Sequence, residues 1–302
     1  MSVKTVQATI NGQTYNLTLN SATGAYEATI TAPSKSSYPL NGHYYPVSIR
    51  AEDTAGNVTT KDATDSTIGS ALRLTVKEKV APVIAITAPT ASAFMTNNKP
   101  VITWTITDDD SGVNPATIKL TIDSGTAITS GITKTASGKG YTCSYTPGTA
   151  LSDGSHTIKV DAKDFDGNAA AQKSVTFKID TVPPVLNVTA PTDGLVTKNP
   201  TCNVTGNTND ATSSPCTVTI KLNNGTAASV TVNADGTFSK SLTLVEGLNT
   251  ITVVSRDSAG KTNTITRKVT LDTKAPVISE PTLVPNPVDA GKTFVLSVKV
   301  TD

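Results

Sequence analysis

The sequence contains little cysteine, few aromatic residues and almost no net charge. Three cysteines occur in 302 residues, aromatic residues make up 4% of the chain, and the formal net charge is +1. An odd number of cysteines is a poor disulfide framework, and a neutral chain lacks the basic surface that neutralises phosphates. We therefore expect no nucleic-acid partner. A disulfide between Cys202 and Cys216, which fall in one repeat, stays an open alternative.

Long hydrophobic runs are missing too. No segment has the roughly 18 apolar residues that span a bilayer, and the opening residues, MSVKTVQATING, lack the apolar stretch of a signal peptide. The sequence therefore predicts no membrane insertion. Release of a phage particle by lysis would need no such signal, so we expect a virion or extracellular location.

Motifs of catalysis are equally scarce. The two histidines, His43 and His156, occupy equivalent positions before a strand in two repeats, which suits a structural role better than an acid–base pair. The sequence has no nucleophile elbow, zinc-protease motif or phosphate-binding glycine loop. We expect no enzyme activity and no cofactor.

Short segments of alternating apolar and polar residues recur throughout the chain. Examples are VITWTITD, TIKLTID, TITRKVTLD and VLSVKVTD. A period of two predicts half-buried strands with β-branched residues on the pleat. Turn signals rich in Gly, Pro, Asn-Gly and Asp-Gly separate them, and short strands at this spacing are typical of all-β sandwiches.

Two landmarks repeat at long period. Pro82, Pro184 and Pro276 each follow a strand and precede an apolar segment, and they are 102 and 92 residues apart, the length of one Ig-type sandwich. Later in each repeat come AEDTAGN, AKDFDGN and SRDSAGK. In these hairpins the Asp bonds its own turn and the Gly takes positive φ.

These landmarks resemble bacterial Ig-like repeat domains, which are common in surface proteins and phage virion proteins. The resemblance implies tandem Ig-like β-sandwiches arranged in a rod. The chain departs from antibody-type domains, since it has no paired core cysteines and its single tryptophan, Trp104, lies on the second strand of its repeat with Ile102 and Ile106 on the same face.

The aligned landmarks divide the chain into four segments. Residues 80–180 and 181–272 each form a complete Ig-like domain. Residues 1–79 align with the third repeat from its strand C onward, so that Ile10 corresponds to Leu222 in the alignment. They therefore lack strands A and B. Residues 273–302 contain strands A and B alone.

An incomplete sandwich exposes an apolar face and an unpaired edge, both of which favour strand addition. We expect the A–B strands of one subunit to complete the sheet of the next, giving a head-to-tail homo-oligomer or filament. Two alternatives stay open. Residues 1–79 are a small domain by themselves and residues 273–302 are a loose or partner-bound extension, or residues 273–302 complete residues 1–79 of the same chain. The predicted interface residues are Phe294, Leu296, Val298, Val300, Val277, Val6, Ala8 and Ile10.

Acidic turns offer a candidate calcium site. Carboxylates at alternate loop positions suit Ca²⁺, but the spacing departs from the EF-hand loop, so turn capping is the favoured interpretation and no metal is predicted. The four residues are Asp108, Asp110, Asp164 and Asp166.

A tyrosine cluster is the only candidate for ligand binding. Tyr38, Tyr44 and Tyr45 lie in a long connection of the first segment, and long loops often carry function, although ordinary packing is the favoured interpretation. The sequence thus predicts a non-enzymatic structural subunit of a phage particle or extracellular filament. The alternative is a surface adhesin or receptor-binding module, with other virion proteins, cell-surface proteins or glycans as partners.

Overall fold

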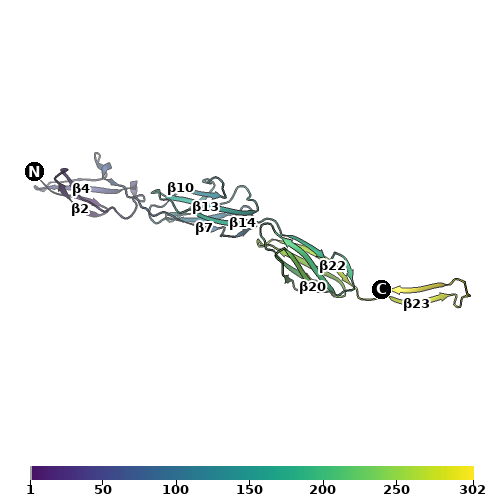
Figure 1. Cartoon of the computed structure of the whole chain (residues 1–302). Coiled ribbons are helices and arrows are strands. Elements are labelled where there is room, and N and C mark those ends of the chain that lie inside the picture. Colours follow the sequence, from purple (N-terminus) through teal and green to yellow (C-terminus); the bar gives the residue numbers. More distant parts are fainter. Residues whose placement is uncertain (1) are drawn as a thin grey trace. The chain divides into compact units, whose positions relative to one another are not determined.

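The computed structural model describes residues 2–302, and the chain divides into two compact units between Ile179 and Asp180 (Figure 1). The described residues form β-strands joined by turns and two short 3-10 helices. No helix among them is long and apolar enough to cross a membrane.

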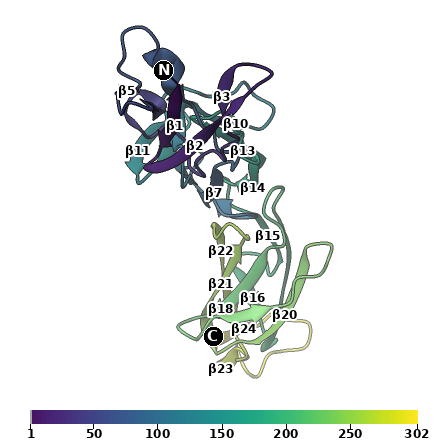
Figure 2. The same cartoon turned by 90° about the vertical axis from the view of Figure 1, so that its left-hand side faces the viewer.

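The first unit begins with one six-stranded sheet in the order β3-β2-β1-β4-β5, with β6 also paired to β4 (Figure 2). Asn11 and Gly12 make the turn between β1 and β2 at φ 48° and 75°, as two-residue hairpins favour. The helices η1 (Asn41–His43) and η2 (Gly69–Leu72) lie in the connections. The strands are β1 (Val3–Ile10), β2 (Gln13–Asn20), β3 (Ala25–Glu27), β4 (Tyr45–Asp53), β5 (Val58–Lys61) and β6 (Arg73–Leu74).

The rest of the first unit is a sandwich of two four-stranded sheets. One has the order β11-β12-β9-β7 and the other β10-β13-β14-β8, with β8 parallel to β14. The strands are β7 (Val83–Ala88), β8 (Phe94–Met95), β9 (Ile102–Thr107), β10 (Val113–Ile122), β11 (Thr133–Ser137), β12 (Gly140–Tyr145), β13 (Gly154–Asp164) and β14 (Lys173–Ile179).

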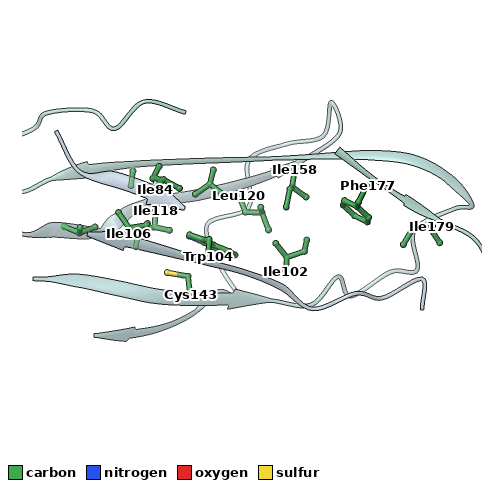
Figure 3. Packing of buried hydrophobic residues seen from close by; sticks show 13 residues of the cluster. Ile84, Ile102, Trp104, Ile106, Ile118, Leu120, Cys143, Ile158, Phe177 and Ile179 are labelled. Carbon is green, nitrogen blue, oxygen red and sulfur yellow. The ribbon is translucent and has the colours of Figure 1, made fainter. Parts of the chain in front are cut away.

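The core of this sandwich is formed by inward residues of both sheets. Trp104 from β9 faces Leu120 and Ile158 from the opposite sheet, and Phe177 fills the far end (Figure 3). All four are fully buried. Alternation along each strand brings these side chains to one face, so the period-two pattern directly determines the core.

The second unit contains another sandwich. Its sheets have the orders β15-β17-β20 and β16-β22-β21-β18-β19, and Val204, Phe238 and Ile251 lie in its core. The strands are β15 (Val185–Ala190), β16 (Leu195–Thr197), β17 (Thr201–Asn209), β18 (Thr217–Leu222), β19 (Ala228–Val230), β20 (Thr237–Thr243), β21 (Gly247–Arg256) and β22 (Thr262–Leu271).

The second unit ends with a two-stranded hairpin, β23 (Val277–Val284) and β24 (Val295–Thr301) (Figure 1). Every residue of β24 is exposed. An isolated pair of strands is marginally stable in water.

Candidate functional site

The hairpin repeats the pairing of β7 with β9 and of β15 with β17 in the two sandwiches. Ile278 lies opposite Val300, as Ile84 lies opposite Ile106 in the first unit. Within the sandwich these two isoleucines are buried, whereas Ile278 is 70% exposed. The hairpin therefore has the register of a strand A–strand B pair without the second sheet that would cover it.

The register also decides which side chains share a face. Val277 lies opposite Thr301, on the face away from Val300, so the choice of Val277 from the sequence is corrected to Ile278 because side chains alternate along a strand. The resulting apolar face, called the hairpin face below, consists of Ile278, Leu283, Leu296, Val298 and Val300, all exposed. The predicted Phe294 precedes β24 and is 50% exposed.

The N-terminal sheet repeats the other half of a sandwich. Ala8 of β1 lies opposite Ile49 of β4, as Ile220 lies opposite Val253 in the second unit. Val253 is fully buried, but Ile49 is only half-buried. The two sheets thus share this strand pairing, but the side chains of the N-terminal sheet are less buried.

Part of that sheet is already covered within the chain. Ala8 and Ile10 are buried, while Val6 is half-buried. Leu19 at the neighbouring strand is 55% exposed. The more exposed part of the sheet therefore lies near Val6. Two of the predicted interface residues, Ala8 and Ile10, are covered by side chains of their own chain.

The predicted tyrosine cluster divides into two environments. Tyr38 stacks on Phe165 and on His43, with ring centroids 4.2 and 4.3 Å apart. Tyr45 is buried and donates to the Lys35 carbonyl at 3.2 Å. Tyr44 and Tyr45 line a pocket of about 700 Å³ together with Thr9, Asn11, Gly12, Leu40, Asn41, Pro46, Val47, Ser48, Asp62, Ala63 and Thr64.

Two of the four residues considered as calcium ligands lie close together in the structure. Asp108 and Asp164 converge with Glu78, with one ligand atom of each within 4.8 Å of the others. Asp110 accepts instead from the Ser36 amide and Asp166 from the Glu78 amide. The latter two carboxylates are thus engaged by backbone.

A second cluster of three carboxylates was missed from the sequence. Asp180, Asp210 and Asp257 converge within the same distance in the second unit. They occupy the repeat positions of Glu78, Asp108 and Asp164, so aligning the acidic residues of the repeats would have found them.

The remaining titratable candidates are structural. All three cysteines are buried and free, so Cys202 and Cys216 do not pair, and burial raises the pKa of the Cys143 thiol to about 11. His156 contacts the Asp123 carboxylate through Nδ1 at 2.9 Å and the Ser152 carbonyl through Nε2 at 2.8 Å.

Comparison with known families identifies both sandwiches. Residues 82–181 match the family model described as a bacterial Ig-like domain. The sandwich of residues 82–181 is thus similar to a bacterial Ig-like domain. Residues 184–273 match the model for domain B of glucodextranase. The expected resemblance to bacterial Ig-like repeats and the all-β tandem fold are confirmed.

Several solved structures are similar to the Ig-like chain. Fibronectin(III)-like modules of Clostridium thermocellum CbhA are 17% identical with a TM-score of 0.38, covering 62% of this chain and 93% of that one. Sidekick-1 immunoglobulin domains 1–5 are 12% identical (TM-score 0.40; 99% and 60% covered). A stretch of titin domains is 13% identical (TM-score 0.42; 87% and 85% covered). A search of curated proteins finds no match.

Proposed function

We propose that this protein is a non-enzymatic structural subunit that assembles head to tail by strand complementation between copies. The hairpin face of one chain packs on the open face of the N-terminal sheet of another. One observation carries the proposal: the hairpin has the strand register of the complete sandwiches and an exposed apolar face, and the N-terminal sheet pairs β1 with β4 as the second unit pairs β18 with β21.

The hydrophobic effect favours this union. Fully burying a side chain such as Leu296 or Val298 stabilises by roughly 1.5–3 kcal/mol. The hairpin face offers five such residues on a surface that water otherwise covers. A contact between two different surfaces is heterologous, so repetition extends it into a filament or closes it into a ring.

The carboxylates of the repeats support the equivalence of the two halves. In each complete sandwich one acidic residue precedes the repeated proline by four positions, a second follows strand B, and a third lies in the late hairpin turn. Asp272, directly before the C-terminal segment, and Asp302, within it, take the first two positions, and Asp53 of the N-terminal sheet takes the third.

Two substitutions on one strand test the assembly. Val298→Lys places a charge on the hairpin face, whereas Val295→Lys places the same charge on the opposite face of β24, where the equivalent Val101 is exposed in the first unit. Light scattering across a concentration series should show growth for the native chain and for Val295→Lys, but a monomer for Val298→Lys. A native chain that stays monomeric, or equal growth of both variants, would refute the proposal.

We further propose that the assembly belongs to a phage particle or an extracellular filament, where tandem Ig-like domains serve as spacers. Negative-stain microscopy of the purified protein should show fibres or rings. Dispersed single particles at high protein concentration would contradict it.

The pocket at Tyr44 favours adhesion as a second candidate function. It has about 700 Å³ of space, and the Arg73 guanidinium lies 5.0 Å from the Tyr44 ring centroid. Aromatic and polar groups around such a space suit a small ligand. A glycan panel should then show saturable binding that Tyr44→Ala removes and Val298→Lys retains; no saturable binding would reject this function.

A further inference from the structure

Three carboxylates of the second unit come together at one end of its sandwich. Asp180 precedes β15, Asp210 follows β17, and Asp257 follows β21. One ligand atom from each lies within 4.8 Å of the others. All three residues are more than nine-tenths buried, at 1%, 8% and 5% exposure. Three neighbouring acidic groups are therefore held away from water.

Hydrogen bonds from the surrounding turns fix these carboxylates in place. Asp180 accepts from the Val182 amide and from the Ser213 hydroxyl. Asp210 Oδ1 accepts from the Thr212 and Ser213 amides at 2.8 and 2.7 Å. This pre-organised arrangement costs no rearrangement when an ion binds.

One oxygen of the cluster has no partner. Asp257 Oδ1 accepts from the Lys261 amide at 2.8 Å, but the buried Oδ2 accepts no hydrogen bond. Among the described residues, no lysine, arginine or histidine forms an ion pair with any of the three carboxylates. Buried charge without a partner is strongly unfavourable, so the arrangement calls for a bound cation.

The equivalent cluster of the first unit shows what a satisfied arrangement looks like. There Asn168 donates its Nδ2 to Asp164 Oδ2 at 2.6 Å and its amide to Asp164 Oδ1 at 2.7 Å. Lys261 takes the place of Asn168 in the second unit, and only its backbone amide reaches Asp257. The replacement of Asn168 by Lys261 thus accounts for the unpaired Oδ2 of Asp257.

We propose that Asp180, Asp210 and Asp257 bind one Ca²⁺ ion. Calcium takes carboxylate oxygens at about 2.3–2.6 Å, so two ligands on opposite sides of it are separated by roughly 4.6–5.2 Å. Magnesium usually keeps several waters and binds through one or two carboxylates, so three converging carboxylates favour calcium. Water completes the coordination shell.

The ion links the segment before β15 to the ends of β17 and β21. Because binding requires the folded arrangement, calcium stabilises the second unit. All three ligands belong to that unit, so the site stands whether or not chains assemble.

Titration calorimetry of the full chain, stripped with EDTA and titrated with CaCl₂, tests the site. We expect one ion per chain and a higher unfolding temperature with calcium than with EDTA. Asp257→Asn should weaken binding at least tenfold and remove the thermal shift. Lys261→Asn should also weaken binding at least tenfold, since its amide can donate to Oδ2 as Asn168 does. Because Lys261 is half-exposed, its replacement by Asn should leave the fold intact.

Asp108→Asn, in the cluster of the first unit, is the matched control and should bind calcium as the native chain does. Absence of binding at millimolar CaCl₂ would overturn the proposal. So would native-like binding by Asp257→Asn, or loss of binding in Asp108→Asn alone, which would place the ion in the other cluster.

Discussion

The strand pairs β7–β9 and β23–β24 share one pairing register but differ in what covers them. Trp104 of β9 is fully buried beneath the opposite sheet, whereas Val298, at the equivalent position of β24, is 45% exposed. The same strand pairing therefore forms with and without a covering sheet. Burial, and hence most of the stability, depends on a second sheet that the hairpin lacks.

Truncating the two equivalent residues should give the largest contrast. Trp104→Ala leaves a cavity in the core, and we expect the free energy of unfolding to fall by about 3–5 kcal/mol. Val298→Ala should change the unfolding of dilute protein by less than about 0.5 kcal/mol. Denaturant unfolding followed by circular dichroism measures both. Equal losses would show that the hairpin is already buried within its own chain.

Adding a methyl group at the same position of the second sandwich should have an intermediate effect. Gly206 of β17 occupies the place of Trp104, and a Cβ there would lie 2.6 Å from the Phe238 ring and against the Asn187 carbonyl. We expect Gly206→Ala to destabilise the second unit by about 1–3 kcal/mol. Denaturant unfolding by circular dichroism checks this value, and an unchanged midpoint would contradict the close packing.

We expect pH to have a smaller effect on stability, through His156 in the sandwich of the first unit. Burial opposes the charged form of His156, but hydrogen bonds to the Ser152 carbonyl and Asp123 carboxylate raise its pKa above the ordinary value overall. The folded state therefore binds the proton more tightly than the unfolded chain, and this stabilisation is complete below the unfolded pKa of about 6.5 and is lost as pH rises through the folded pKa.

Denaturant midpoints of the first unit, followed by Trp104 fluorescence, should accordingly fall as pH rises above about 6.5. His156→Gln should flatten this dependence. A midpoint that rises with pH in the native chain would reverse the sign and refute the assignment.

Strand positions were accessible from the sequence because alternation and turn residues are local signals. The face of Trp104, Ile102 and Ile106 follows from period two alone. The choice between Val277 and Ile278 did not, since it depends on the register across the hairpin. The burial of Ala8 also depends on long-range packing, which local sequence patterns do not predict.

The carboxylate clusters show a different limit. Asp108 and Asp164 were singled out as loop residues, but their convergence with Glu78 brings together three segments distant in sequence. The fold shows that the same three positions converge again in the second unit, and that Lys261 in place of Asn168 leaves Asp257 Oδ2 unpaired.

Hydrogen exchange measured at low and high protein concentration tests strand complementation most directly. If copies complete each other, the amides of β24 and of the N-terminal sheet become protected together as concentration rises, while those of β9 stay protected throughout. Unchanged exchange in β24 at concentrations where the chain associates would contradict the account, since association would then use another surface.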